Sequence, residues 1–310
     1  MSAWLIAVIV VSCLIFLVGL WFFSGYIAFL LTLRKGSLAG KIINRTMQKN
    51  IESYKIDYQW WDKQKIEKLF LKTEEETLVG NLIRNGNSKK IAIVVHGIFG
   101  THKDLAPQAK ILFENGFNIL APDLRAHGET TGKNISMGCF EKDDLVLWIN
   151  KLVEVFGKDC QIVLLGISMG GATVLLTSGE NLPKNVKCVV SDSGYSNAYL
   201  ELKSVVNKAL VPSFIILPQL NFFLKKLSNF DLKQASPIDA VKTTSLPILF
   251  IHGNKDSFVP CKMSKEMFEV SNKEICEFQI FEGAIHIQSF ATNENLYEKI
   301  LLSFVDKWVC

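Results

Sequence analysis

Hydrophobic side chains follow two different patterns along this chain. From Ala3 to Leu33 there is no charged side chain. Beyond residue 62, short runs rich in β-branched residues alternate with longer windows in which apolar positions recur at helical spacing. The first pattern is typical of a membrane-spanning helix, and the second of a domain in which strands alternate with helices.

The amino-terminal segment is long enough to cross a bilayer, whose core of about 30 Å needs roughly 20 helical residues. A signal peptide would have a basic amino end, but residues 1–4 carry no basic side chain. A faint lipoprotein box ends at Cys13, and the apolar run continues well past it. We therefore predict an uncleaved transmembrane anchor over residues 1–33, with residues 3–33 in contact with lipid in a cell membrane.

Basic residues follow this segment, and none precedes it; they are Arg34, Lys35, Lys41, Arg45 and Lys49. The positive-inside rule then places the carboxyl-terminal domain on the cytoplasmic side, with the extracytoplasmic side as the alternative. Residues 34–62 are basic and aromatic and are interpreted as a juxtamembrane linker. Residues 63–310 form the predicted folded domain.

The strand and helix patterns in this domain predict an α/β fold. Lys65–Leu71 and Thr77–Ile83 form an expected hairpin, and six buried strands are expected at Ile91–Val95, Asn118–Ala121, Ile162–Leu165, Val186–Ser191, Ile248–His252 and Glu277–Phe281. Helices are expected at Asp104–Glu114, Glu141–Phe156, Met169–Ser178, Cys261–Ser271 and Asn293–Trp308. Apolar strands that alternate with helices indicate a mostly parallel sheet covered on both faces.

A long insertion interrupts this alternation between about residues 195 and 244. It contains the apolar run Leu210–Leu227, which Pro212 and Pro218 interrupt, so a second transmembrane helix is not expected. The run is interpreted either as a pair of core-packed helices or as a small apolar lid that lines a pocket for an acyl or aromatic group. The two interpretations are compatible.

Composition narrows the possible partners. The 34 Lys and Arg residues outnumber the 30 Asp and Glu residues by only four, too small a surplus to indicate nucleic acid. Seven scattered cysteines without a CxxC pair favour neither a disulfide framework nor a zinc site. No metal-ligand spacing or phosphate-binding loop appears, so no cofactor is expected. The sequence does not specify the oligomeric state.

A candidate nucleophile lies in Gly166-Ile167-Ser168-Met169-Gly170-Gly171, between a predicted strand and a predicted helix. A GxSxG motif in that context places its serine on a sharp turn at the carboxyl edge of the sheet. Gly166 and Gly170 provide the space that such a crowded turn requires. We therefore expect Ser168 to act as a nucleophile rather than as an ordinary helix cap.

A serine hydroxyl needs a base held in one tautomer by an acid, and in this arrangement the acid and then the histidine follow the serine along the chain. Of the five histidines, His286 alone lies after the best acid, Asp256, which stands in a polar loop after the strand that ends near His252. Asp192, after the preceding strand, is the alternative acid.

Two backbone N–H groups would stabilise an oxyanion formed by attack on a carbonyl. One is expected from Met169. The other is expected from the loop His96-Gly97-Ile98-Phe99-Gly100, at Ile98 or, failing that, at Phe99. His96 is expected to support this loop, in which Gly97 permits close approach of the backbone. The charged loop Asp123–Glu129 is interpreted as a structural support.

Together these motifs resemble the α/β-hydrolase superfamily, and most nearly small bacterial membrane-anchored hydrolases of the serine-aminopeptidase and dienelactone-hydrolase-like branch. The resemblance covers about residues 65–308. It rests on His96-Gly97, Asp123–Gly128, Gly166–Gly171, Ala235-Ser236-Pro237, His252–Asp256 with Val259-Pro260, and His286. It implies a Ser168–Asp256–His286 triad and an acyl-enzyme. Ile285 departs from the glycine common before the histidine, which puts the turnover rate in doubt.

The expected activity is that of a carboxylesterase acting on a small-molecule ester with an apolar acyl or aromatic part. An aminopeptidase or amidase is the alternative enzyme and would be favoured by an acidic anchor for a substrate amine. The carboxylates of the insertion, Glu201, Asp231 and Asp239, form no obvious cluster in the sequence. A catalytically silent scaffold at the membrane is the third hypothesis.

Overall fold

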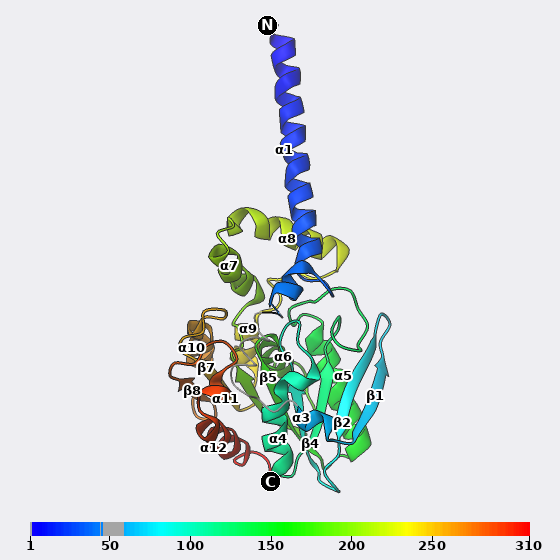
Figure 1. The fold of residues 1–310 in the computed structure, drawn as a ribbon, viewed down its shortest axis with the longest axis vertical. Coiled ribbons are helices and arrows are strands. Elements are labelled where there is room, and N and C mark those ends of the chain that lie inside the picture. Colours follow the sequence, from blue (N-terminus) through cyan, green and yellow to red (C-terminus); the bar gives the residue numbers. More distant parts are fainter. Residues whose placement is uncertain (1, 44, 46–58) are drawn as a thin grey trace.

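The computed structural model describes residues 2–43, 45 and 59–310. The long helix α1 (Ala3–Leu31) projects away from an α/β domain and carries the amino terminus at its far end (Figure 1). Among the described residues, α1 is the one helix long and apolar enough to cross a membrane, and an amino-terminal signal sequence would have the same properties. Nearly half of the predicted linker, including Lys49, lies outside the described residues.

The domain is built on a sheet of eight strands in the order β1-β2-β4-β3-β5-β6-β7-β8. β2 pairs antiparallel with β1 and β4, whereas all the other pairs are parallel. The predicted mostly parallel sheet is therefore confirmed. The strands are β1 Ile66–Lys72, β2 Thr77–Ile83, β3 Lys90–Val95, β4 Asn118–Asp123, β5 Gln161–Ile167, β6 Val186–Asp192, β7 Ile248–Gly253 and β8 Glu277–Phe281.

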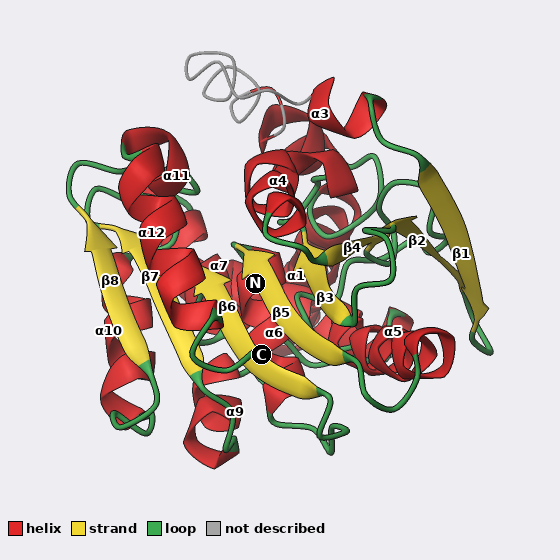
Figure 2. Cartoon of the chain, turned by 90° about the horizontal axis from the view of Figure 1, so that it is seen from below, coloured by secondary structure: helices red, strands yellow, loops and turns green. Residues whose placement is uncertain are grey.

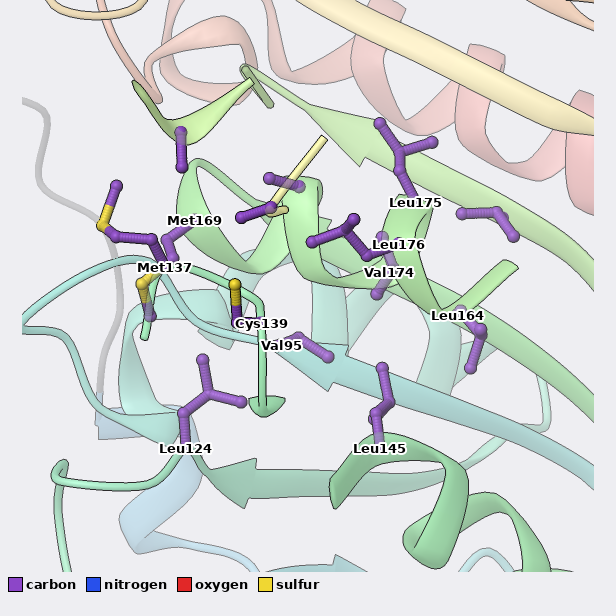
Figure 3. Close-up of a cluster of buried hydrophobic side chains, with 14 of the residues drawn as sticks. Val95, Leu124, Met137, Cys139, Leu145, Leu164, Met169, Val174, Leu175 and Leu176 are labelled. Carbon is purple, nitrogen blue, oxygen red and sulfur yellow. The ribbon is translucent and has the colours of Figure 1, made fainter. Parts of the chain in front are cut away.

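Helices cover both faces of the sheet, as predicted (Figure 2). One face packs against α3 (Gln59–Asp62), α4 (Ala106–Glu114), α11 (Ser289–Thr292) and α12 (Glu294–Val305). The other packs against α5 (Glu141–Phe156), α6 (Met169–Ser178), α9 (Pro237–Thr243) and α10 (Cys261–Val270). On this second face Leu145, Leu164 and Leu176 belong to one buried cluster, which fixes α6 behind the centre of the sheet (Figure 3).

Several boundaries differ from the prediction. β4, β5 and β7 extend beyond their apolar runs, because backbone pairing continues to Asp123, Ile167 and Gly253 after the strongly hydrophobic pattern ends. The helix expected from Asp104 begins as a 3-10 turn, His102–Leu105, before α4. Trp60 and Trp61 fall in the predicted linker, yet both are buried against the domain core.

The insertion forms α7 (Ala198–Lys208) and α8 (Ser213–Leu227), which lie at the base of α1 (Figure 1). α8 continues through Pro218 rather than breaking there. It packs against α1, where a Cβ on Gly25 would lie 2.6 Å from the Cβ of Gln219. The Ser24 hydroxyl donates a hydrogen bond to Oε1 of Gln219 at 3.1 Å. α1 and α8 thus pack directly against each other. α9, the last helix of the insertion, instead belongs to the layer that covers the sheet.

Candidate active site

Ser168 stands between β5 and α6 with backbone angles φ 53° and ψ −120°. A positive φ is strained for a residue with a side chain, and the tight turn around it has room because Gly166 and Gly170, two residues before and after Ser168, have none. A Cβ on Gly166 would lie 2.2 Å from the Gly170 carbonyl oxygen, and one on Gly170 would lie 2.0 Å from that of Val95. These two glycines let α6 begin against β3 and β5, so that Ser168 lies at the carboxyl edge of the sheet.

The imidazole of His286 lies between Ser168 and Asp256. Its Nε2 is 2.9 Å from Ser168 Oγ, and its Nδ1 is 2.7 Å from Asp256 Oδ2. All three side chains are buried or nearly so. With the proton on Nδ1 donated to the carboxylate, Nε2 is free to accept the serine proton. Ile285 does not displace the loop from this geometry.

Asp256 is held by more partners than His286 alone. Its Oδ1 accepts the N–H groups of Phe258 (2.8 Å) and Val259 (2.9 Å), and Nε2 of His252 lies 3.1 Å from Oδ2. Burial by itself raises the pKa of Asp256, but hydrogen bonds from His252 and His286 outweigh it and lower the pKa to about 2. The carboxylate therefore stays ionised while it orients the imidazole.

Asp192, the alternative acid, is occupied elsewhere. Its Oδ1 accepts hydrogen bonds from the hydroxyls of Ser193 at 2.9 Å and Ser289 at 3.3 Å. Its backbone carbonyl accepts the N–H of Ser168 at 2.8 Å. Burial raises the pKa of the Asp192 carboxyl. In the structure His286 therefore contacts Asp256, whereas the backbone carbonyl of Asp192 holds the turn that carries Ser168.

The loop after β3 passes close to Ser168. A Cβ on Gly97 would lie 3.2 Å from the Cβ of Ser168. The Phe99 N–H already donates to Nε2 of His127 at 2.8 Å. Within the described residues the N–H groups of Ile98 and Met169 donate no hydrogen bond, so these two remain available to an oxyanion.

Two buried histidines support this loop. His96 accepts the Leu124 N–H on Nε2 at 3.0 Å and donates from Nδ1 to the Gly97 carbonyl at 2.7 Å. His127 donates from Nδ1 to the Arg125 carbonyl at 2.9 Å. Burial lowers the pKa of each imidazole to about 4, so both are neutral near pH 7. They tie the end of β3 to the end of β4 without carrying charge.

A mostly apolar cavity lies next to Ser168. Its walls include Leu202, Val205 and Val206 from α7 and Leu220 from α8, so the insertion covers the site as the lid interpretation expects. The chain just after α1 contributes the rest of one wall; these residues are Thr32, Leu33, Ala39 and Ile43. The same segment is fixed to the domain, because the Ile135 N–H donates to the Leu33 carbonyl at 2.9 Å.

One carboxyl group lines this apolar cavity. Glu201 of α7 is 2% exposed, and neither of its side-chain oxygens has a hydrogen-bond partner. Burial raises its pKa to about 8, with repulsion from Asp256 adding to the effect and Lys208 opposing it. The other acids of the insertion pair with lysines outside the cavity, Asp231 with Lys225 and Asp239 with Lys242.

Sequence reasoning missed three parts of this site. His252 was excluded as the base, and its contact with Asp256 depends on the turn after β7. Glu201 is an isolated acid in the sequence. It lies four residues before Val205 and therefore on the same face of α7, but this spacing does not show whether that face points toward the active site. The segment after α1 gave no signal of forming a wall. No cluster of three or more His, Cys, Asp or Glu residues suited to a metal occurs in the described ranges.

Comparisons with known proteins agree with this architecture. A family model for the alpha/beta hydrolase fold matches residues 92–221. The uncharacterized protein YqkD of Bacillus subtilis (strain 168) is 28% identical over 219 residues, which cover 69% of this chain and 70% of YqkD. Human protein ABHD12B is 25% identical over 214 residues, which cover 64% of this chain and 55% of ABHD12B.

Solved structures show the same fold. The Pyrococcus furiosus esterase Pf2001 superposes with a TM-score of 0.65 at 24% identity, covering 80% of this chain and 92% of the esterase. An acylaminoacyl peptidase from Pyrococcus horikoshii gives a TM-score of 0.60 at 18% identity, covering 82% of this chain and 44% of the peptidase. At these identities the likeness shows the fold, and the chemistry must be argued from this chain's own residues.

Proposed function

The chain is a member of the α/β-hydrolase superfamily, and on that premise we propose that it is a serine hydrolase that cleaves a carboxylic ester through an acyl-enzyme. The observation that carries the proposal is the hydrogen-bonded chain from Ser168 through His286 to Asp256, at 2.9 Å and 2.7 Å. Ser168, at one end of this series of hydrogen bonds, stands on a strained turn beside an apolar cavity.

In the proposed first half-reaction, Ser168 Oγ attacks the ester carbonyl while its proton moves to Nε2 of His286. Asp256 stabilises the imidazolium that results. The carbonyl oxygen takes up negative charge, and the N–H groups of Ile98 and Met169 stabilise it. The C–O bond to the alcohol then breaks, and His286 returns the proton to the departing alcohol oxygen.

In the second half-reaction, water attacks the acyl-enzyme carbonyl. His286 accepts a proton from this water, and the same two N–H groups stabilise the second oxyanion. Collapse breaks the bond to Ser168 Oγ, which recovers its proton from His286 and releases the carboxylic acid. His96 and His127 are neutral near pH 7, so neither imidazole places a full charge beside the loop that carries the Ile98 N–H.

The cavity favours an ester with an apolar acyl or aromatic part. Leu202, Val205 and Leu220 offer no polar group to a substrate chain. An aminopeptidase would need an ionised anchor for its substrate amine, and Glu201, the one carboxyl among the cavity-lining residues described, favours its neutral form. We therefore place the amidase second.

We further propose that α1 anchors the enzyme in a bilayer, with the domain on the cytoplasmic side. The lid supports anchoring, because the loop after α7 exposes Leu210 and Val211, and the first turn of α8 exposes Phe214 and Ile215. α8 lies at the base of α1 (Figure 1). A protease-sensitive tag fused at Cys310 tests the orientation. In sealed right-side-out vesicles the tag should resist added protease until detergent is added, and cleavage without detergent would reverse the proposed orientation.

A fluorophosphonate probe tests the proposed nucleophile. The wild-type chain should be labelled, Ser168→Ala should not, and Ser257→Ala should be labelled like wild type because the exposed Ser257 side chain lies outside the proposed chemistry. Failure of the folded wild-type protein to react, or equal labelling of Ser168→Ala, would refute the proposal and favour a silent scaffold. A series of nitrophenyl esters against aminoacyl anilides then separates the esterase from the amidase.

A further inference from the structure

Glu201 is a buried carboxyl group that the proposed chemistry does not use. Its side chain lines the same cavity as Ser168, and both carboxyl oxygens lack a partner. A buried polar group without a hydrogen bond costs stability, so its presence in an apolar wall calls for an explanation. Substitution by a hydrophobic residue would fill this wall without that cost.

We propose that Glu201 is a substrate-recognition residue whose neutral carboxyl hydrogen-bonds an uncharged polar group, specifically a hydroxyl, on the ester that occupies the cavity beside Ser168. This inference rests on the proposed esterase function and names the substrate class more closely. The substrate is then an ester with an apolar acyl part and a free hydroxyl within reach of α7.

The surroundings of Glu201 favour the neutral carboxyl. Leu202, Val205 and Leu220 from the lid helices are apolar neighbours in the cavity wall. Asp256 is the acidic group whose charge opposes ionisation. Lys208 is the basic group that favours ionisation, but its Nζ donates a hydrogen bond to the Ser257 carbonyl instead of to Glu201. Tyr195 also lines the cavity, and its hydroxyl donates to the Met137 carbonyl at 3.0 Å.

The neutral acid determines the ligand chemistry. A protonated carboxyl has one O–H donor and one carbonyl acceptor, and a hydroxyl can satisfy both at once. An ammonium group has donors only and requires the ionised carboxylate. Because burial holds the pKa of Glu201 near 8, the form suited to a hydroxyl predominates at pH 7.

Paired esters test this inference on the full chain in detergent micelles. One series carries a terminal hydroxyl on the alcohol or on the acyl part, and the matched series carries a methyl group there. The readout is the ratio of kcat/KM for the hydroxylated ester to that for its methyl partner. For at least one pair of esters we expect the wild-type ratio to be about 3- to 10-fold higher than the ratio measured for Glu201→Ala. This factor corresponds to the free energy that one hydrogen bond contributes.

Two further variants make the result specific. Glu201→Gln keeps a neutral donor and acceptor and should retain the wild-type ratio, and the exposed control Glu274→Ala should also retain it. The wild-type ratio should fall as the pH rises through about 8, where Glu201 ionises, and should stay level in Glu201→Gln.

The failures can be told apart. If Ser168→Ala still hydrolyses the esters, the proposed function is wrong. If Ser168→Ala is inactive but Glu201→Ala keeps the wild-type ratio, only the role of Glu201 is wrong. If wild type prefers aminoacyl esters and both Glu201→Gln and Glu201→Ala lose that preference, the ionised carboxylate binds an ammonium group, which overturns the inference.

Discussion

The backbone N–H of Phe99 donates to Nε2 of His127 at 2.8 Å, which removes Phe99 from the possible oxyanion donors and leaves Ile98. The contact also fixes the loop that carries Ile98, since Phe99 itself has a left-handed φ of 59°. His127, a neutral histidine in the loop after the neighbouring strand β4, thus determines which backbone N–H remains available for the proposed reaction.

His127→Ala should slow catalysis without removing any group from the substrate. Loss of the acceptor frees the Phe99 N–H and loosens the Ile98 loop, and we expect kcat to fall by about 10- to 100-fold, since small misplacements are costly. Steady-state kinetics measure the loss, and circular dichroism checks the fold. An unchanged kcat would show that the loop holds its position without His127.

Asp256→Asn should reduce kcat by about 10³- to 10⁴-fold, because the imidazole would lose the acceptor that fixes its tautomer. Asp192→Asn is the matched comparison, since Asp192 contacts serine hydroxyls instead of His286, and its effect should stay below about 10-fold. A larger loss in Asp192→Asn than in Asp256→Asn would transfer the role of the acid to Asp192.

Gly25→Leu should separate α8 from α1. Even a Cβ on Gly25 would lie 2.6 Å from that of Gln219, whereas Gly19 on the same helix has nothing within 4 Å and provides the control Gly19→Leu. The lid contributes Leu220 to the cavity, so KM for long-chain esters should rise about 3- to 10-fold, with little change for an acetate ester. Equal effects on both chain lengths would argue against lid displacement.

Glu201→Gln should alter how stability depends on pH. The pKa of Glu201 is about 8 in the folded chain against an ordinary value of 4.5. Between these values the folded state binds more protons than the unfolded state, so the stabilising effect of the retained proton is full below pH 4.5 and is lost as the pH rises through 8.

The Tm of Glu201→Gln relative to wild type should therefore increase from pH 5 to pH 8.5, by an amount that reflects about 1–3 kcal/mol. Thermal unfolding in detergent at a series of pH values provides the measurement, with Glu274→Gln as the control. A Tm difference that stays constant with pH would mean that Glu201 is not held neutral.

The sequence predicted those strands and helices whose formation depends on residues close together along the chain. The strand before Ser168 and the helix after it were visible because β5 is apolar and α6 begins at Met169 after a glycine-flanked serine. The positions of Asp256 and His286 followed from the order of strands along the chain. Their actual contact depends on the packing of β7 and β8, which the structure supplies.

Long-range packing explains what the sequence did not predict. Trp60 and Trp61 were assigned to a linker because nothing nearby in the sequence marks them as core residues. Trp60 nevertheless packs on Phe113 of α4, and Trp61 packs on His102 in the 3-10 turn before α4. The tie between His252 and Asp256 forms only when the chain turns back after β7. The direction in which Glu201 faces is fixed by the packing of α7 and α8 over the sheet edge.

Leu33, Ala39 and Ile43 form a wall of the cavity, although they lie next to the segment that is most readily deleted to obtain a soluble protein. A shortened chain starting at residue 59 would retain every group proposed for the chemistry but would open the cavity to water on that side. Its selectivity would then describe a different binding site, so screens for natural substrates should use the chain with its amino-terminal helix intact.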